Sequence, residues 1–317
     1  MRVVSIEEIR RVIGPREAFR SAEIAFRAMA EGRVRLPLPM ALSIPERQGE
    51  VHIKAAHLAG SPVFIVKIVS GFGANASDGI AINSGYLGVF DAETGHPLGI
   101  LVDAGYLTDL RTAAAGALAA TLLAPRDPAK IAIIGAGVQA RYQLRALSHA
   151  GVRAGQTVAW GRTPGALEIY CREMRLDPGA SVSAASSPEE AVRGADLIVT
   201  ATSAREPVIE ARWLSPSVTV IAVGADMPEK RELGRGILAR ADKIVVDSLA
   251  QCIAFGELHH GVAGADVSAA DVYADLGEIA SNRKAGREGA EMIVCDLTGL
   301  GAQDAAIGEV AWSQLGR

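Results

Sequence analysis

The sequence predicts an α/β protein of two domains, one of them built on a Rossmann-type parallel sheet. Its 317 residues match about two domains of ordinary size. From residue 131 onward, fully apolar runs alternate with helical segments, which is typical of a parallel sheet covered by helices on both faces. A glycine-rich turn at residues 135–140 joins the first apolar run to a helical segment. We therefore expect a nucleotide-binding sheet in the middle of the chain.

The N-terminal part predicts two helices followed by a mostly antiparallel sheet. Ser5 and Glu8 have the spacing of a capping box that opens a short helix. Pro15 suits the first turn of a second helix that ends near Gly32. Residues 36–103 then consist of short β-branched runs separated by Gly, Asn and Asp turns, as expected for hairpin-connected strands.

A helix of small residues is expected to join the two domains. Thr108 can cap a helix at residues 109–124, which Pro125 ends. We place the domain boundary within this helix, so that residues 1–115 form the first domain and residues 116–298 the second. The runs expected to form parallel strands lie at residues 131–134, 157–160, 197–201, 218–223, 244–246 and 292–295.

Composition excludes several classes of protein. Thirty-two Lys and Arg against 36 Asp and Glu give a net charge of −4, too evenly mixed for binding to a nucleic-acid backbone. The longest stretch of small apolar residues, 113–124, is too short to cross a bilayer, and Glu7 and Glu8 stand where a secretory signal would be apolar. Three cysteines, Cys171, Cys252 and Cys295, lie far apart and outside any CxxC pattern, which indicates a reducing, cytoplasmic location.

No metal site is expected from the histidines. The six of them lack the HExxH motif or any comparable metal-binding spacing. Adjacent side chains such as those of His259 and His260 point apart on most backbones, so we expect this pair at the surface or in a turn.

The turn at residues 135–140 has the GxGxxA pattern of a dinucleotide site. In that pattern Gly135 permits the tight turn, Gly137 lets the backbone approach a pyrophosphate, and Ala140 lets helix and strand pack closely. Val138 and Gln139 then begin a helix whose free N–H groups and partial positive charge face the phosphates. A purely structural glycine turn is the alternative, but the strand before it and the helix after it favour nucleotide binding.

The end of the second expected strand favours NADP(H) over NAD(H). An NAD site usually carries Asp or Glu there to bind the ribose 2′-hydroxyl, whereas this chain has Arg162 and Thr163. A guanidinium beside a hydroxyl can bind a 2′-phosphate. In the alternative interpretation Arg162 stacks on adenine or is solvated, and NAD(H) is the cofactor.

Three charged residues are candidates for chemistry. Asp226 follows the apolar run at residues 218–223, at the edge where parallel sheets bind ligands. Lys67 lies inside an apolar strand and therefore needs an anion. Arg111 lies in the first turn of the expected helix, where a cation gains nothing from the helix dipole. The alternatives are an ordinary structural ion pair for the two cations and a cap or turn role for Asp226.

Five stretches together resemble the ornithine cyclodeaminase and μ-crystallin family in order and spacing. They are residues 67–70, 107–114, 135–140, 224–233 and 296–304. The resemblance covers almost the whole chain. It implies a Rossmann domain in the middle, an N-terminal substrate and dimerisation domain completed by residues 299–317, and a homodimer.

The resemblance also implies roles for individual residues. Lys67 and Arg111 would hold a substrate carboxylate beside the nicotinamide, and Asp226 would be the acid/base at the reacting nitrogen. The residues expected at the cofactor, besides the glycine turn with Arg162 and Thr163, are Arg111, Thr112, Gln139, Thr202, Val223, Gly224 and Thr298.

The chain departs from the family pattern at two places. The Pro-x-Arg of many members is Pro37-Leu38-Pro39 here, so a carboxylate-binding arginine is missing. Lys54 stands near where ornithine cyclodeaminases carry a carboxylate for the distal ammonium of the substrate, and a cation there would repel ornithine. Lys54 either replaces the absent arginine or is a solvated edge-strand lysine.

The resemblance therefore favours an NAD(P)H-dependent reductase of a small cyclic imino acid, such as a pyrroline or piperideine carboxylate. Hydride would pass to the imine carbon while Asp226 supplies the proton on nitrogen. Two alternatives stay open. One is an ornithine cyclodeaminase with tightly held NAD, and the other is a protein that binds NADP(H) and a small ligand without turnover.

Overall fold

In the computed structural model, which describes residues 1–177 and 181–315, the chain forms two compact units. The first comprises Met1–Arg111 and the C-terminal segment from Leu300 onward, and the second comprises Thr112–Gly299. The division falls within the helix α3 (Tyr106–Leu123). That the two units act as substrate and cofactor domains stays a prediction, and each unit is described here by itself.

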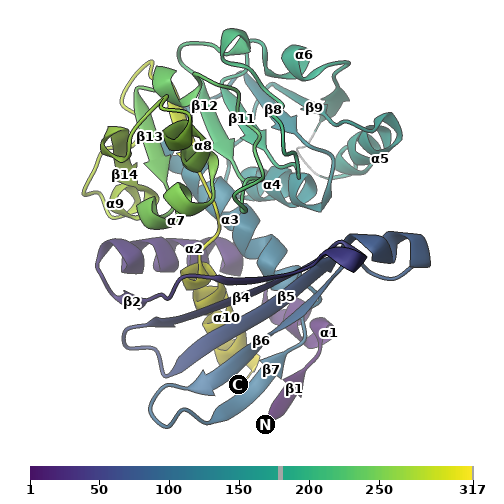
Figure 1. Ribbon diagram of the computed structural model, residues 1–317, viewed down its shortest axis with the longest axis vertical. Coiled ribbons are helices and arrows are strands. Elements are labelled where there is room, and N and C mark those ends of the chain that lie inside the picture. Colours follow the sequence, from purple (N-terminus) through teal and green to yellow (C-terminus); the bar gives the residue numbers. More distant parts are fainter. Residues whose placement is uncertain (178–180, 316–317) are drawn as a thin grey trace. The chain divides into compact units, whose positions relative to one another are not determined.

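The first unit is a mixed sheet with helices on one face (Figure 1). Its strand order is β1-β7-β6-β5-β4-β2, with β3 also paired to β4. All the pairs are antiparallel except β1 with β7, so the expected mostly antiparallel sheet is confirmed. The strands are β1 (Arg2–Val4), β2 (Val34–Arg35), β3 (Met40–Ile44), β4 (Gly49–Leu58), β5 (Val63–Phe72), β6 (Asn83–Asp91) and β7 (Pro97–Leu101), with 3₁₀ turns at Pro45–Arg47 and Gly73–Asp78.

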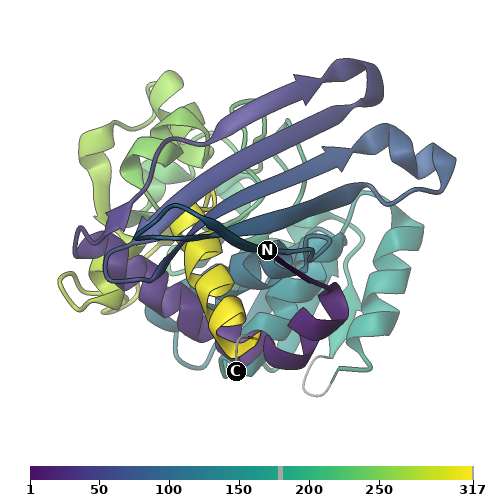
Figure 2. The same ribbon diagram turned by 90° about the horizontal axis from the view of Figure 1, so that it is seen from below.

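The helices of this unit are α1 (Ile6–Val12), α2 (Pro15–Ala30) and α10 (Gly301–Leu315). Ser5 and Glu8 form the predicted capping box of α1. The helix α10 packs against α2, β4 and β5, and Figures 1 and 2 show it lying along the sheet. At Gly308 a Cβ atom would lie 3.2 Å from the Ile65 and Leu87 side chains, so the small residue allows the close packing of helix on sheet.

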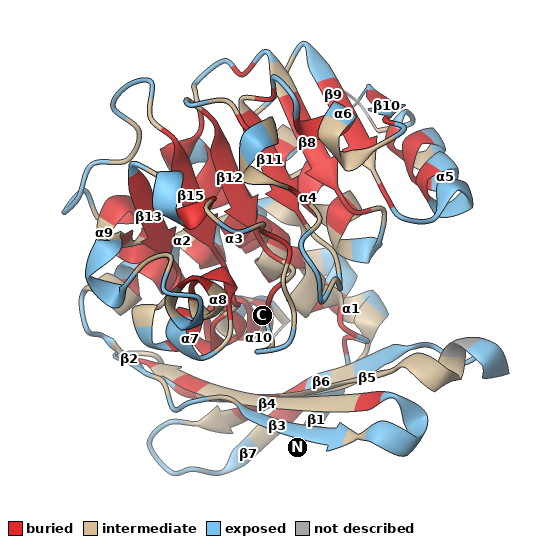
Figure 3. Ribbon diagram, turned by 45° about the horizontal axis from the view of Figure 1, so that its top comes forward, coloured by how far each residue is buried: buried red, intermediate tan, exposed pale blue. Residues whose placement is uncertain are grey.

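The second unit contains a parallel sheet of order β10-β9-β8-β11-β12-β15-β13-β14. Every strand pair in it is parallel, which confirms the expected Rossmann-type sheet. Figure 3 shows its central strands as almost entirely buried. The strands are β8 (Lys130–Ile134), β9 (Gln156–Trp160), β10 (Val182–Ala184), β11 (Leu197–Thr200), β12 (Thr219–Ala222), β13 (Lys243–Val246), β14 (Val272–Asp275) and β15 (Ile293–Asp296).

Helices follow most of these strands. They are α4 (Val138–His149), α5 (Pro164–Met174), α6 (Pro188–Val192), α7 (Leu249–Ala254), α8 (Glu257–Ala263) and α9 (Leu276–Ala280), with 3₁₀ turns at Ala211–Trp213, Leu238–Arg240 and Ala269–Asp271. Two strands were not predicted, β10 and β14, which are short and lie at the two ends of the sheet.

The start of α3 differs from the prediction. The helix begins at Tyr106 rather than after a Thr108 cap, because the Asp103 carboxylate accepts a hydrogen bond from the Leu107 N–H at 2.8 Å. Gly105 takes the positive φ of 85° that the turn into the helix requires. Arg111 therefore lies beyond the first turn, and the helix-dipole argument for its role was wrong.

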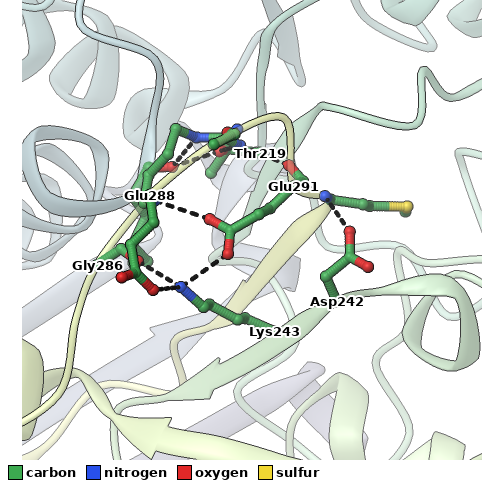
Figure 4. A network of polar contacts seen from close by, with 10 residues as sticks. Thr219, Asp242, Lys243, Gly286, Glu288 and Glu291 are labelled. Carbon is green, nitrogen blue, oxygen red and sulfur yellow. Dashed lines mark hydrogen bonds and ion pairs between the residues drawn. The ribbon is translucent and has the colours of Figure 1, made fainter.

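A network of polar contacts centred on Lys243 holds the long connection between α9 and β15 (Figure 4). The Lys243 ammonium donates to the Gly286 carbonyl at 2.8 Å and pairs with Glu288 and Glu291 at 3.0 and 2.8 Å. Burial alone would lower the pKa of Lys243, but the two carboxylates outweigh it and raise the pKa. This lysine is therefore a structural cation, and the connection that it anchors leads into β15.

The three cysteines form no disulfide bond. Cys171, Cys252 and Cys295 are all buried and unbridged. Within residues 1–177 and 181–315, none of the helices combines the length and apolar character needed to span a bilayer.

Candidate functional site

The glycine turn of the second unit has the geometry that a dinucleotide site needs. Gly135 follows β8 with φ of 126°, and a Cβ atom there would lie 2.4 Å from the Ala201 carbonyl oxygen. Only glycine fits that position. By contrast, a Cβ atom on Gly137 would meet nothing within 4 Å, so the backbone before α4 faces open space. The N–H groups that begin α4 are therefore accessible to an anion such as a pyrophosphate.

These glycines line a cleft of about 290 Å³ within the second unit. Arg162 and Thr163, both exposed, line the same cleft at the end of β9, together with Trp160 and Thr202. The structure thus brings together several of the residues that the sequence analysis assigned to the cofactor. Arg141 of α4, which was not predicted, holds the glycine turn. It donates to the carbonyls of Ala136 and Gly137 at 2.7 and 3.0 Å and pairs with Glu173.

Other predicted cofactor residues are engaged with the protein itself. The Thr202 hydroxyl and N–H both donate to Glu232, as does the Gly224 N–H. The Thr298 hydroxyl donates to Asp247 at 2.9 Å and accepts from the Gln251 amide, and Thr298 is buried. Contact of these side chains with a cofactor stays a prediction.

Four further predicted cofactor residues lie in α3, in α4 or directly after β12. Val138 is the exposed first residue of α4, and Gln139, which follows it, is half-buried. The Thr112 carbonyl accepts a hydrogen bond from Gln143, a buried side chain of α4. Val223 is buried directly after β12.

Asp226 lies in the loop that follows β12. Its carboxylate is 2.7 Å from the Lys230 ammonium, and the Asp226 side chain is 43% exposed. The Asp226 N–H donates to the Gly224 carbonyl, which forms a tight turn directly after the strand. Asp226 is therefore an accessible, ion-paired carboxylate at the carboxyl end of a parallel strand, the edge at which such sheets bind ligands.

In the first unit, the two expected cations converge on one buried carboxylate. Lys67 of β5, only 2% exposed, places its ammonium 2.8 Å from Asp304 of α10. Arg111 donates to the same carboxylate at 3.0 Å and to the Gln303 side chain at 2.9 Å. The anion that Lys67 requires is therefore supplied by the protein, as the structural alternative proposed. One carboxylate nevertheless serves two buried cations.

A third cation adds to this cluster. Lys54 of β4, half-buried, lies directly opposite Lys67 in the sheet register. Burial lowers the pKa of Lys67 to about 7; the Asp304 charge opposes this effect, while Arg111 and Lys54 add to it. Burial alone would raise the pKa of Asp304, but the charges of Arg111 and Lys67 outweigh it and lower that pKa.

Two buried cations share one carboxylate in this group. Lys67 and Arg111 both contact Asp304, at 2.8 and 3.0 Å. The charge of Lys67 also acts on Asp103, a carboxyl whose pKa burial raises. We call Lys54, Lys67, Arg111 and Asp304 the cationic cluster. Buried cations such as Lys67 and Arg111 favour the binding of an anion. No metal-binding group of His, Cys, Asp or Glu occurs in the described parts of the chain.

The chain is similar to known proteins along almost its whole length. A model described as the "Ornithine cyclodeaminase/mu-crystallin family" matches residues 2–315. An uncharacterized cyclodeaminase of Sinorhizobium fredii is 37% identical over 318 residues, which cover 99% of this chain and 96% of that protein. The Δ1-pyrroline-2-carboxylate reductase of Bacillus cereus and the ketimine reductase mu-crystallin of Mus musculus are each 30% identical.

Solved structures share the fold over the whole chain. That of Thermococcus litoralis Δ1-pyrroline-2-carboxylate reductase, in complex with NADH and L-proline, has a TM-score of 0.93 and is 27% identical, covering 99% of this chain and 97% of that one. An archaeal alanine dehydrogenase dimer with bound NAD has a TM-score of 0.90 and is 34% identical, covering 98% and 94%. The relatives therefore include enzymes that use NAD(H) and small amino acids.

Proposed function

We propose, because the chain belongs to the ornithine cyclodeaminase/mu-crystallin family of NAD(P)-dependent reductases and cyclodeaminases, that it reduces a small cyclic imino acid. The substrate class is a five- or six-membered ring with a carboxylate on the imine carbon. The observation that carries the proposal is that two buried cations, Lys67 and Arg111, share the single carboxylate of Asp304, because such a substrate presents one further carboxylate. The nucleotide cleft of the second unit supports the other half of the reaction.

The cationic cluster supplies substrate binding in this proposal. Lys67 and Arg111 donate charge-assisted hydrogen bonds to the substrate carboxylate, each worth about 1.5–3 kcal/mol. Asp304 keeps both cations oriented in the absence of substrate, since it contacts each of them at 2.8–3.0 Å. Because the cluster is buried, water competes little for these donors.

Proton transfer is assigned to Asp226. The reduced nicotinamide, when bound, supplies the hydride that reduces the imine carbon. The Asp226 carboxyl group, in its protonated form, gives its proton to the nitrogen directly or through a water, and the carboxylate that this leaves pairs with the Lys230 ammonium at 2.7 Å.

NADPH consumption with a panel of cyclic imino acids, run beside ammonia release from ornithine, tests this function. The proposal expects loss of NADPH absorbance and no ammonia. Ammonia release without net oxidation would show the cyclodeaminase. The relative from S. fredii favours that activity, whereas a cation at position 54, which would repel the distal ammonium of ornithine, disfavours it. If NADPH is not consumed and no ammonia is released, the protein binds its ligands without turnover.

We further propose NADP(H) as the preferred cofactor. Arg162 and Thr163 are exposed in the cleft at the end of β9, where a 2′-phosphate can accept hydrogen bonds from both. The solved structures of the archaeal alanine dehydrogenase and of the T. litoralis reductase hold NAD and NADH. Equal or lower KM values for NAD(H) than for NADP(H) would contradict the preference for NADP(H).

A homodimer is proposed from the sheet of the first unit. Met40 and Leu42 of β3 are 66% and 58% exposed and continue, through their register partners Ile53 and Val51, onto β4. An apolar sheet face of this kind is typical of an interface. We expect a dimer by light scattering and a monomer after Met40→Asp with Leu42→Asp.

The free, buried cysteines fit a reducing compartment, and we propose a cytoplasmic location on that ground. Cell fractionation tests it, and recovery in the membrane or secreted fraction would contradict it.

A further inference from the structure

Glu232 is a fully buried carboxylate that joins the ends of two neighbouring strands. One of its oxygens accepts hydrogen bonds from the Thr200 hydroxyl at 2.6 Å and the Gly224 N–H at 2.8 Å. The other accepts from the N–H and the hydroxyl of Thr202 at 2.6 and 2.7 Å. Thr200 ends β11, and Gly224 follows β12, so a single side chain fixes both strand ends.

The surroundings are shaped to admit this carboxylate. A Cβ atom on Gly224 would lie 2.5 Å from the carboxyl carbon of Glu232 and 2.2 Å from the Thr202 carbonyl oxygen. Only glycine fits at position 224, because both the Thr202 carbonyl and the Glu232 carboxylate approach it so closely. The backbone of Glu232 is itself held, since Glu257 accepts the N–H groups of Glu232 and Leu233 at 2.6 and 3.1 Å.

Both segments that Glu232 fixes lead to the candidate site. Thr202 and the two residues after it form one wall of the nucleotide cleft, and the Ala201 carbonyl packs against Gly135. On the other side, Gly224 accepts the N–H of Asp226 and so begins the loop that carries the proposed acid/base. A displacement of the Glu232 carboxylate would therefore move the cleft wall and the Asp226 loop together.

We propose that Glu232 is a positioning residue that sets the shape of the nucleotide cleft and the position of the Asp226 loop. Its effect on dinucleotide affinity needs only the cleft, whereas its effect on turnover rests on the proposed function. Burial raises the pKa of the Glu232 carboxyl, and the hydrogen bonds from Thr200, Thr202 and Gly224 oppose that effect. Four donors around it suit a carboxylate, which only accepts hydrogen bonds.

The variant Glu232→Gln tests the proposal at nearly constant volume. The amide keeps one accepting oxygen, and its NH₂ group, which only donates, takes the place of the other. That NH₂ group faces either Thr202 or the Gly224 N–H, so one of these donors loses its acceptor. We expect the Kd for NADPH, measured by quenching of protein fluorescence without imino acid, to rise about 10-fold, equivalent to about 1.4 kcal/mol.

A matched control exists at the opposite edge of the same sheet. Asp196 accepts the N–H groups of Ala129 and Lys130 at 2.6 and 3.1 Å, so it too binds backbone at a strand end, but before β8. Asp196→Asn is expected to lower the melting temperature and leave the Kd unchanged. A wild-type Kd in Glu232→Gln, or an equal rise in Asp196→Asn, would overturn the positioning role.

Milder variants keep the test decisive if Glu232→Gln does not fold. Thr200→Val removes one donor to the carboxylate, whereas Thr200→Ser retains it, so a few-fold rise in Kd is expected for valine and none for serine. Equal affinities of the two would contradict the inference. If the wild-type protein binds neither NAD(H) nor NADP(H), the proposed function and this inference both fail; if it binds normally and the variants do too, only this inference fails.

Discussion

The nucleotide cleft and the cationic cluster keep their shapes by different means. The cleft depends on backbone conformation within a short stretch, since Gly135 and Gly137 lie two residues apart and act through missing side chains. The cluster depends on charges that four separate elements bring together, with Arg111 and Asp304 separated by 193 positions. Added side-chain volume therefore damages the cleft, whereas a removed charge damages the cluster.

The largest expected effect is a loss of turnover when Asp226, the proposed proton donor, is replaced. Asp226→Asn should lower kcat about 10²- to 10⁴-fold, because it removes the proton donor while keeping the volume. NADPH affinity should remain, since Asp226 is not among the residues that line the cleft. Near-normal turnover of the variant would show that another group delivers the proton.

The next effect isolates the cluster from the cleft. Lys67→Met should lower kcat/KM for the imino acid about 100-fold by removing one charge-assisted hydrogen bond, while Asp304 stays paired with Arg111. The Kd for NADPH should not change.

Lys243 provides the matched control for this variant, because it is also a buried lysine paired with carboxylates. Lys243→Met should lower the melting temperature but leave kcat/KM as it was. If both lysine variants affect kcat/KM equally, the cluster has no special role in substrate binding.

Substitutions of Gly135 and Gly137 test whether the cleft is sensitive to added side-chain volume. Gly135→Ala places a Cβ atom 2.4 Å from the Ala201 oxygen at a φ of 126°, so it should destabilise the protein by about 1–3 kcal/mol in urea unfolding. Gly137→Ala meets no atom and should leave stability unchanged while it weakens dinucleotide binding. Equal losses of stability in the two variants would contradict this assignment.

The smallest expected effect is a pH dependence confined to the cluster. The pKa of Lys67 is lowered to about 7, so its ammonium is present below pH 7 and is lost as the pH rises through that value. The KM for the imino acid should therefore increase above pH 7, by up to about 10-fold per unit. The Kd for NADPH should stay flat over this range, and parallel changes in both constants would argue against Lys67 as the titrating group.

The local parts of this molecule could be predicted from the sequence. The central parallel strands, the glycine turn and the capping box each depend on residues close together in the chain, and all are confirmed. The short end strands β10 and β14 were missed, because three or four residues carry too little pattern. The start of α3 was misplaced, because Asp103 and not Thr108 provides the side-chain hydrogen bond.

The long-range pairings could not be predicted. Asp304 and Glu232 both lie in stretches that carry the family resemblance, yet neither was assigned a role. A carboxylate inside the apolar residues of α10 was the available signal for Asp304, because a buried charge requires a partner. The sequence contains no comparable signal for Glu232, whose partners are 8 to 32 positions away.

The most direct test of the central claim compares two imines that differ only in the carboxylate. NADPH consumption is measured with Δ1-pyrroline-2-carboxylate and with Δ1-pyrroline, at equal concentrations. If Lys67 and Arg111 bind the substrate carboxylate, the first should be reduced with a kcat/KM about 10²- to 10⁴-fold higher, as two charge-assisted hydrogen bonds predict. Equal kcat/KM values for the two imines would contradict the claim.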